Sequence, residues 1–373
     1  MRYNTLMILD YLKLYPEAFG LDISNLSLKV AKLKKVRGGY HLVSYGEAAI
    51  APGVIEAGEI KKEKELVKAI AKVLKNIHGE KLREPYVVAS LPEKQAFLQV
   101  VQLPQMGEKE IEHAIRFEAE NHIPYPIETV YLDSQIVTPL NNHIDHTDVL
   151  LGALPKDSVD SYAAAIQNAG LIPTALDIES VAISRVLAQE NTATSPMLIV
   201  DMGASRANFI VFSGHSIRFT ASINFASKSI TDKIGKIFKV KEDKAEQLKR
   251  AYGVAVDDEE GKKVAQSVVP LLGILVSEIK RYMEYYESHP AHQHLGKKDQ
   301  NIKKVVLSGG GTNLRGLTEF LSKELKVEVV LGNPWLNILP SSLKQLPPLA
   351  FADSLRYTTV LGLALRGVNG EQS

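Results

Sequence analysis

The first part of the chain alternates short apolar runs with turn residues and then continues into an amphipathic helix. Apolar runs bounded by turn residues predict strands at residues 21–23, 27–33, 40–45 and 87–91. Residues 63–78 place Leu66, Ile70 and Leu74 at helical spacing, and Gly79 is predicted to end that helix. Strands that alternate with helices indicate an α/β fold.

The pattern changes between about residues 85 and 172, where a smaller group of elements follows. Its predicted strands span residues 97–101, 130–137 and 149–153, and its predicted helices span residues 109–121 and 158–168. Pro124 and Pro126 follow the first of these helices and are expected to end it. We therefore interpret residues 85–172 as a small α/β insert within a first lobe that covers residues 1–190.

A second lobe is predicted over residues 191–373, and it opens with a Thr- and Ser-rich stretch at 191–196 that is typical of a linker. Its predicted strands span residues 197–201, 207–212, 216–222, 304–307 and 327–331. Its predicted helices span residues 229–238, 241–251, 264–288, 317–325 and 357–366. The predicted order along the chain is therefore lobe, insert, lobe.

The composition is that of a folded protein with two or three domains. The 373 residues are 45% hydrophobic, which is enough for a substantial core. A formal net charge of +1 provides no general field that would attract nucleic acid, so no nucleic-acid partner is predicted. The chain has no cysteine, which excludes disulfides, thiolate nucleophiles and Cys-based zinc sites and fits a reducing compartment.

The N-terminal segment, residues 1–18, is apolar in part. Asp10 and Lys13 interrupt it and no small-residue cleavage site follows, so neither a signal peptide nor a membrane span is predicted. A short helix there would either pack on the protein or lie on a membrane surface. We expect a cytoplasmic protein.

One short pattern occurs twice. Residues 21–30 and residues 200–209 each contain an apolar run that ends in Asp, a small polar turn and a second apolar run. The repetition predicts two related lobes whose hairpin turns face each other across a cleft. Backbone N–H groups of such turns would hold a polyphosphate, and the aspartates would hold its metal.

The residue types in the two turns suit phosphate and Mg²⁺. Asp22 ends one strand and Lys29 lies on the next, so the carboxylate would bind Mg²⁺ mostly through water while the lysine offsets phosphate charge. In the second turn Gly203 follows Asp201 and allows close backbone approach. Alone, the first turn is more typical of a surface β-turn with a solvated lysine and the second of an ordinary hairpin, and only the pair favours a phosphate site.

A run of three glycines, residues 309–311, lies between a predicted strand and a predicted helix. Glycines there would admit a ligand against the main chain, and the helix N-terminus would present free N–H groups. The run lacks the spacing of a P-loop or of a dinucleotide-binding turn. The alternative is a flexible loop in which Asn313 caps the helix.

Other polar groups have ordinary explanations. Glu246 and Lys249 are one helical turn apart, a spacing typical of a solvated ion pair. His289, His292 and His294 lie in a polar stretch without an acidic neighbour, which favours a loop over a metal site. No Ser-His-Asp order or paired-carboxylate motif stands out.

In their order along the chain, the two hairpins and the glycine run resemble the nucleotide site of the actin, Hsp70 and sugar-kinase superfamily. The resemblance matches Asp22 and Lys29 to the first phosphate hairpin, and Asp201 and Gly203 to the second. It matches the glycine run to the adenosine loop. It implies that ATP and Mg²⁺ bind in the cleft between the lobes.

The helix with Glu246 and Lys249 gains a role from the same resemblance. Bacterial actin-like members carry an Ala-Glu-x-x-Lys helix whose Glu meets the ribose hydroxyls and whose Lys flanks the adenine, and Ala245, Glu246 and Lys249 match it. Glu179, in a Glu-Ser-Val-Ala stretch, matches the connecting motif near the attacking water and is the candidate catalytic residue for weak or slow ATP hydrolysis.

The position of the insert resembles the FtsA branch of this superfamily. Residues 103–106, 110–120, 123–126, 132–133 and 359–367 resemble the PilM family of type IV pilus assembly proteins. The resemblance implies a two-lobed actin-like, ribonuclease H-like ATPase fold with an FtsA-type 1C subdomain inserted in the first lobe. It also implies a 2B-like helical part at about residues 227–302 and a final helix, residues 354–367, that returns to the first lobe.

The PilM resemblance further implies a partner. A groove beside the insert is expected to hold the cytoplasmic N-terminal peptide of a PilN-like protein of the inner-membrane pilus assembly complex. The chain would then act as a nucleotide-responsive adaptor at the cytoplasmic face of the inner membrane, peripheral to the membrane through its partner, and self-association stays open. The candidate nucleotide-binding residues are Asp22, Ser24, Ser27, Lys29, Asp201, Gly203, Ala204, Ser205, Glu246, Lys249, Gly309, Gly310, Gly311 and Asn313, with Asp22 and Asp201 also for the metal.

Two positions depart from the superfamily pattern, and two other functions compete. Ser24 stands where many members have Gly, and Arg206 stands where a small or hydroxylic residue is common. An FtsA-like polymerising division protein is one alternative, although the ending at residues 367–373 lacks the basic, aromatic amphipathic helix such proteins carry. A small-molecule kinase is the other, although no Asp obviously serves as its base.

Overall fold

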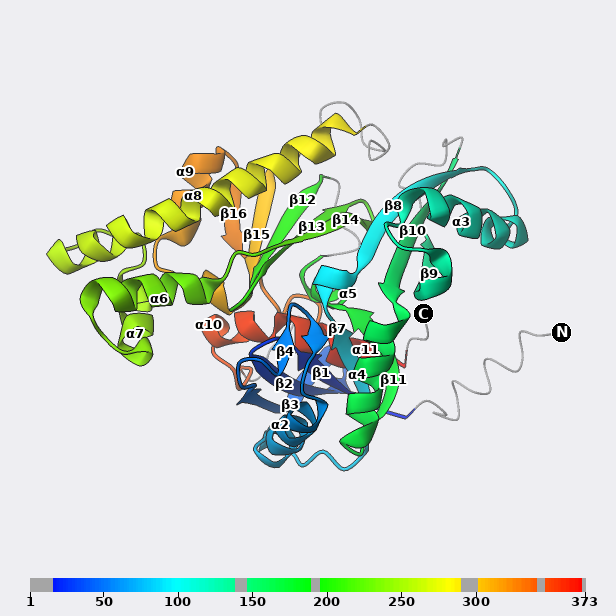
Figure 1. The fold of residues 1–373 in the computed structure, drawn as a ribbon, viewed down its shortest axis with the longest axis horizontal. Coiled ribbons are helices and arrows are strands. Elements are labelled where there is room, and N and C mark those ends of the chain that lie inside the picture. The colour runs from blue at the N-terminus through cyan, green and yellow to red at the C-terminus, as the bar shows by residue number, and fades with distance from the viewer. Residues whose placement is uncertain (1–15, 138–145, 189–194, 290–300, 341–345, 371–373) are drawn as a thin grey trace.

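The structure is a computed structural model that describes residues 16–137, 146–188, 195–289, 301–340 and 346–370 (Figure 1). Several expectations lie outside these ranges: the helix within residues 1–15, most of the linker at 191–196, His292 and His294, and the last residues of the chain, 371–373. Two large sheets organise the described part of the chain into two lobes (Figure 1).

The first sheet has six strands in the order β11-β7-β1-β2-β3-β6. They are β1 Phe19–Ile23, β2 Ser27–Val36, β3 Gly39–Ala49, β6 His78–Gly79, β7 Tyr86–Leu91 and β11 Ile172–Ile178. Strand β1 is antiparallel to β2 and parallel to β7, and all five of its residues are buried. The end of β1 therefore lies between neighbouring strands in the middle of the sheet and not beside an outer strand. A small hairpin, β4 Ile55–Glu56 and β5 Glu59–Ile60, follows β3.

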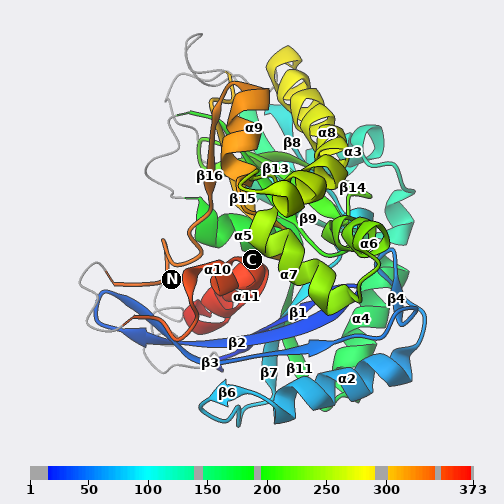
Figure 2. The same ribbon diagram turned by 90° about the vertical axis from the view of Figure 1, so that its left-hand side faces the viewer.

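Helices cover both faces of the first sheet (Figure 2). Helix α2 Glu63–Lys75 packs on β2 and β3 and contacts α4 Lys156–Asn168, which packs on β11. On the other face lie α5 Glu179–Leu187 and α11 Thr358–Asn369, and α11 packs on β1, β2 and β7. The last helix of the chain thus packs against the first strand, and both are joined in one hydrophobic core.

The second sheet has eight strands in the order β16-β15-β12-β13-β14-β8-β10-β9. Those from the second lobe are β12 Met197–Met202, β13 Ala207–Ser213, β14 Ser216–Ile223, β15 Lys304–Ser308 and β16 Glu328–Leu331. Those from the segment predicted as an insert are β8 Phe97–Pro104, β9 Val130–Ile136 and β10 His146–Pro155. The insert strands therefore extend the sheet of the second lobe, while β7 and β11 at its ends belong to the first sheet.

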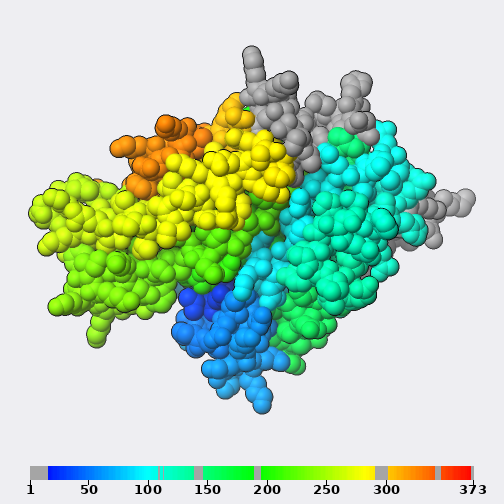
Figure 3. Space-filling view, turned by 45° about the horizontal axis from the view of Figure 1, so that its top comes forward, coloured from blue at the N-terminus to red at the C-terminus, as the bar shows by residue number. Residues whose placement is uncertain are grey.

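Pairing between strands β14 and β8 and one buried ion pair join the insert to the second lobe. Phe219 of β14 pairs with Gln99 of β8. The Arg218 guanidinium contacts the Asp148 carboxylate at 2.5 Å, and both side chains are buried. Figure 3 shows the insert, in cyan, packed directly beside the second lobe.

The remaining elements surround the second sheet or connect the parts. The helices are α3 Glu108–His122, α6 Ser227–Phe238, α7 Glu242–Tyr252, α8 Glu259–Ser288, α9 Leu317–Leu325 and α10 Phe351–Ser354. Short 3₁₀ segments are η1 Glu93–Gln95, η2 Ile127–Thr129, η4 Gly310–Thr312 and η5 Leu355–Tyr357. Among the described residues, no helix combines the length and the apolar character needed to span a bilayer.

Two predicted helix boundaries were wrong, for reasons that lie outside the helical pattern. Helix α2 ends at Lys75 rather than at His78, because His78 and Gly79 instead pair with β3 as strand β6. Helix α8 begins at Glu259, earlier than the predicted 264, because the Asp258 side chain accepts the Gly261 N–H at 2.7 Å and caps it.

Candidate functional site

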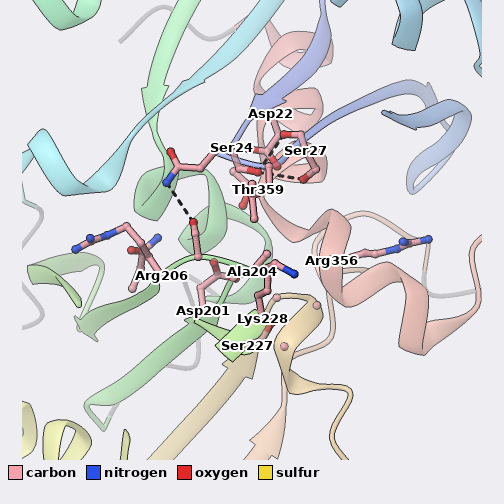
Figure 4. A pocket seen from close by; sticks show the side chains of 18 of the residues that line it. Asp22, Ser24, Ser27, Asp201, Ala204, Arg206, Ser227, Lys228, Arg356 and Thr359 are labelled. Carbon is pink, nitrogen blue, oxygen red and sulfur yellow. Dashed lines mark hydrogen bonds between the residues drawn. The ribbon is translucent and has the colours of Figure 1, made fainter. Parts of the chain in front are cut away.

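The two predicted hairpins face each other across one cavity of about 390 Å³ (Figure 4). It is lined by Asp22, Ser24, Ser27, Lys29, Glu179, Asp201, Gly203, Ala204, Ser205, Glu246, Lys249, Gly309, Gly310 and Gly311. The candidate site residues predicted from the sequence are therefore brought together, with the exception of Asn313. The cavity lies between the ends of β1 in the first lobe and β12 in the second.

In the first hairpin a lysine and an aspartate from adjacent strands are held at the turn. Register pairs Asp22 with Lys29, whose Nζ lies 3.5 Å from Asp22 Oδ2 and donates to Ser27 Oγ at 2.8 Å. Ser90 Oγ donates to the other Asp22 oxygen at 3.1 Å. Asp22 and Lys29 are both buried, so this ion pair is only weakly screened by solvent.

The departure at Ser24 has a local explanation. Its hydroxyl lies 3.0 Å from both the carbonyl oxygen and the hydroxyl of Ser27. The side chain therefore turns back into its own hairpin, where it closes the turn.

The second hairpin has no lysine of its own. Burial, with a smaller contribution from the nearby Asp22 carboxylate, raises the pKa of Asp201 to about 6. The Gly203 N–H donates to the Arg206 carbonyl at 2.9 Å and closes the turn. The Arg206 guanidinium donates to Ser222 of β14, so this departure from the family pattern is bound to a neighbouring strand.

Unpaired backbone donors at both turns fit an anion. Within the described residues, the N–H groups of Asn25, Leu26, Ala204 and Ser205 have no intramolecular acceptor, and all four residues line the cavity. The side-chain Nδ2 of Asn25 donates to Ser205 Oγ at 3.2 Å, which is a direct hydrogen bond between the two turns. Successive N–H groups in such turns form concave anion sites, so a polyphosphate suits this position.

The carboxylates of Asp22, Glu93, Glu179 and Asp201 line the same cavity. Burial raises the pKa of Glu179 well above its usual value, and the neighbouring Asp22, Glu93 and Asp201 carboxylates raise it further. Asn208 Nδ2 donates to Glu179 at 2.8 Å and opposes the shift. A divalent cation would neutralise this group of carboxylates.

A metal here would be bound mainly by water and phosphate. In the described part of the chain, no three His, Asp or Glu side chains converge as direct metal ligands. Mg²⁺ commonly keeps several waters and binds through one or two carboxylates and substrate phosphates, so Asp22 and Asp201 suit such an ion together with a phosphate group.

Helix α7 closes another side of the cavity. The Glu246 carboxylate lies 2.6 Å from Lys249 Nζ, and Thr231 of α6 contacts both side chains. Burial acts to raise the pKa of Glu246, but the bonds from Lys249 and Thr231 lower it overall. Thr231 was not predicted, because its position depends on how α6 packs against α7.

The prediction for the glycine run was wrong in one respect. Residues Gly310–Thr312 form a 3₁₀ turn and α9 begins only at Leu317, so the N-terminus of this helix does not follow the glycines directly. Asn313 does not cap α9, whose cap residue is Gly316, and its side chain donates to the Ala352 carbonyl.

The glycines are required by the packing of main chain on main chain. Gly309 has φ +86°, and a Cβ there would lie 2.6 Å from the Met202 carbonyl oxygen. A Cβ at Gly311 would lie 2.8 Å from the same oxygen. The run therefore seats against the second hairpin, and this contact places it on the wall of the cavity.

Glu93 is a cavity residue that sequence reasoning missed. It lies two residues after the end of the buried strand β7, is buried, and accepts the Ser180 N–H at 3.0 Å. Burial raises its pKa. The available signal was its place after an apolar strand, the same relation that pointed to Asp22 and Asp201.

Two α/β lobes with facing hairpins over one cavity define the actin-like class of proteins, and solved structures agree. Ethanolamine utilization protein EutJ from Carboxydothermus hydrogenoformans matches with a TM-score of 0.55 at 14% identity, over 97% of this chain and 99% of that one. MreB 5 of Spiroplasma citri matches with a TM-score of 0.53 at 10% identity, over 93% and 95%. At these identities the likeness shows the fold alone, and nucleotide binding is expected for that fold.

The profile of the family described as type IV pilus assembly protein PilM matches residues 20–368, and the chain belongs to this family. A solved PilM-PilN type IV pilus biogenesis complex matches with a TM-score of 0.77 at 27% identity, over 95% of this chain and 99% of that one. Cell division protein FtsA of Escherichia coli K12 is 24% identical over 244 residues, 58% of this chain. The chain spans about half the length of these curated FtsA relatives, 55% in that case. The predicted two-lobed fold and family are thus confirmed.

Proposed function

We propose that this protein is an ATP-binding adaptor of type IV pilus assembly that binds Mg²⁺·ATP between its lobes and the N-terminal peptide of a PilN-like inner-membrane protein. The observation that carries the nucleotide is the pair of hairpins with unpaired N–H groups on one cavity. The observation that supports the partner is the match to a PilM-PilN complex along nearly the whole chain. Such an adaptor would lie at the cytoplasmic face of the inner membrane.

The residues divide the work of holding the nucleotide. Lys29 and the free N–H groups of both turns bind the phosphates, and Asp22 and Asp201 orient the waters of the metal. Glu246 is proposed to meet the ribose hydroxyls and Lys249 to flank the adenine, as the resemblance implies. ATP brings to the site a phosphoanhydride bond, and Glu179 is the residue proposed to orient a water near it, with turnover weak or slow.

The sheet topology supports a nucleotide response at the insert. A ligand held by both hairpins favours the closed arrangement of the lobes, because it gains contacts from both only when they approach. The insert strands continue the second-lobe sheet, whereas α4 from the same segment packs on the first lobe. Closure would therefore shift the two sides of the insert relative to each other and reshape a peptide groove beside it.

Calorimetry on the purified full chain tests the proposal in two titrations. The first uses Mg²⁺·ATP, and the second uses a peptide of the first dozen residues of the PilN-like protein, with and without ATP. We expect both ligands to bind, and Asp201→Ala to lose nucleotide while Asp243→Ala, an exposed aspartate on α7, keeps it.

Three results would contradict the proposal. If Mg²⁺·ATP fails to bind the wild-type chain, the nucleotide role is wrong. If the peptide fails to bind while pelleting on lipid vesicles with filament formation is seen, an FtsA-like role replaces it, and brisk phosphorylation of a sugar or carboxylate would instead indicate a kinase.

A further inference from the structure

The chain crosses from the first sheet to the second sheet beside the cavity. Strand β7 ends at Leu91 in the first lobe, and β8 begins at Phe97 in the sheet of the second lobe (Figure 1). Between them lies the single 3₁₀ turn η1, Glu93–Gln95, which contacts β14. The turn η1 is therefore one of the crossings, together with those after β10 and after α5, that a change in the angle between the two sheets would move.

Glu93, the first residue of η1, is hydrogen-bonded to the first lobe, and η1 itself packs on the second. Glu93 Oε2 accepts the Ser180 N–H of α5, in the first lobe, at 3.0 Å. On the other side, η1 packs on β14 of the second lobe, whose Thr220 lowers the pKa of the Glu93 carboxyl and so opposes part of the rise that burial causes. The residue is 4% exposed, and its Oε1 has no partner among the described residues although Glu93 lines the cavity.

Helix α5 depends on this contact for its first turn. Its cap residue is Ile178, which has no side-chain acceptor, and no local side chain caps the helix. Ser180 is the second residue of the helix, where an N-cap side chain would normally accept the N–H. Glu93 supplies that acceptor from a distant part of the chain. Glu179 is the neighbour of Ser180, so this hydrogen bond also helps to fix the position of Glu179.

A merely structural cap would not need a carboxylate here. Burying a carboxylate costs more than burying a hydroxyl, and a Ser or Thr in place of Ile178 would cap α5 locally. The distant carboxylate adds what a local cap cannot supply, because its contact with α5 depends on where η1 lies.

We propose that Glu93 is a positioning residue that links the inserted subdomain to the nucleotide cavity. It holds the first turn of α5, and with it Glu179, in a place that depends on the position of η1. This inference rests on the proposed function, since it concerns how the peptide and nucleotide sites communicate. The link consists of contiguous contacts: β8 to η1, Glu93 to Ser180, and Ser180 to the adjacent Glu179.

The test combines hydrogen exchange with binding. Amide exchange over residues 179–182 is measured by mass spectrometry for the wild type, Glu93→Ala, Glu93→Gln and the double variant Glu93→Ala/Ile178→Thr. The ratio of peptide affinities with and without Mg²⁺·ATP is measured for the same four proteins. Glu284→Ala, at an exposed position on α8, is the matched control.

We expect Glu93→Ala to speed exchange in the first turn of α5 about tenfold and to bring the ratio of peptide affinities close to one. Glu93→Gln keeps a side-chain oxygen that accepts the Ser180 N–H, so it should retain most of both effects, and it serves if the alanine variant does not fold. In the double variant the hydroxyl introduced by Ile178→Thr caps α5 locally. Slow exchange should then return while the ratio stays close to one.

Three outcomes would overturn the inference. Unchanged exchange in Glu93→Ala would show that the cap is not needed. A preserved affinity ratio in Glu93→Ala, or its recovery in the double variant, would reduce Glu93 to a helix cap. If the ratio of peptide affinities is one in the wild type, the nucleotide response of the proposed function fails together with the inference. If the wild type shows a response and Glu93→Ala keeps it, only the inference fails.

Discussion

The two hairpins on the cavity share an outline and differ in how their charge is balanced. In the first, Lys29 contacts Asp22, and the hydroxyls of Ser24 and Ser27 fill the turn. In the second, Gly203 has no side chain, and the cation of the hairpin, Arg206, is bonded to Ser222 and not to Asp201, whose pKa desolvation raises. The first hairpin is thus internally balanced, and the second is not.

This difference indicates which hairpin depends on a ligand. The first supplies the positive charge for a phosphate, and its own ion pair holds it in shape without a ligand. The second supplies close backbone approach and a carboxylate that has no ion pair within its own hairpin, and desolvation raises the pKa of this carboxyl to about 6. A metal ion brought with a nucleotide would offset that desolvation, so binding should stabilise the second hairpin more than the first.

The largest expected effect removes the cation of the first hairpin. Lys29→Met should weaken Mg²⁺·ATP binding by about a hundredfold, equivalent to about 2.7 kcal/mol, because the phosphates lose the cation that faces them. Lys32→Met, which removes a lysine paired with Glu84 on the surface, is the control and should bind normally. Calorimetry measures both, and a loss below threefold for Lys29→Met would show that the hairpins do not divide the charge as described.

The next effect contrasts the two aspartates without any ligand. Asp22→Asn should destabilise the protein by about 1–3 kcal/mol, because it leaves Lys29 buried without its partner. Asp201→Asn should instead raise the free energy of unfolding at pH 7.5 by about 1–3 kcal/mol, because it removes a carboxylate that is partly desolvated and not paired with the Arg206 of its own hairpin.

The pH dependence of the second variant follows from the direction of the shift. The pKa of Asp201 is raised from its usual 3.8 to about 6, so the folded protein binds this proton more tightly than the unfolded chain. That contribution to stability is complete below about pH 3.8 and is lost as the pH rises through about 6. The advantage of Asp201→Asn should therefore shrink from pH 7.5 to pH 4, as measured by urea unfolding. Equal behaviour of the two variants would remove the contrast between the hairpins.

The smallest effect concerns the hydrogen bond between the two turns. Asn25→Ala and Ser205→Ala, combined in a double-mutant cycle, should show a coupling of about 0.5–1 kcal/mol, since the bond is neutral and partly buried. Urea unfolding of the four proteins without nucleotide measures it. A coupling of zero would mean that the turns are not in contact in solution in the absence of a ligand.

The sequence was sufficient for features that depend on neighbours along the chain. An apolar run ending in Asp and a small turn predicted both hairpins, and pairing the two copies predicted their common cavity. Glu93 and Thr231 could not be predicted from the sequence, because their roles depend on contacts with Ser180 and Glu246, which are distant from them along the chain. The glycine run was placed correctly on the cavity wall but for the wrong reason, since it packs on Met202 and does not open a helix N-terminus.

The sequence by itself determined the order of strands and helices, the paired hairpins and the identity of the aspartates, because apolar periodicity and turn residues act over short distances. The tertiary structure alone decided that the insert strands join the second sheet, that Glu93 caps α5, and that Asp201 and Glu179 have raised pKa values. These features arise from long-range strand pairing and from the exclusion of water by packed elements. Neither long-range strand pairing nor the exclusion of water by packed elements exists until the chain has folded.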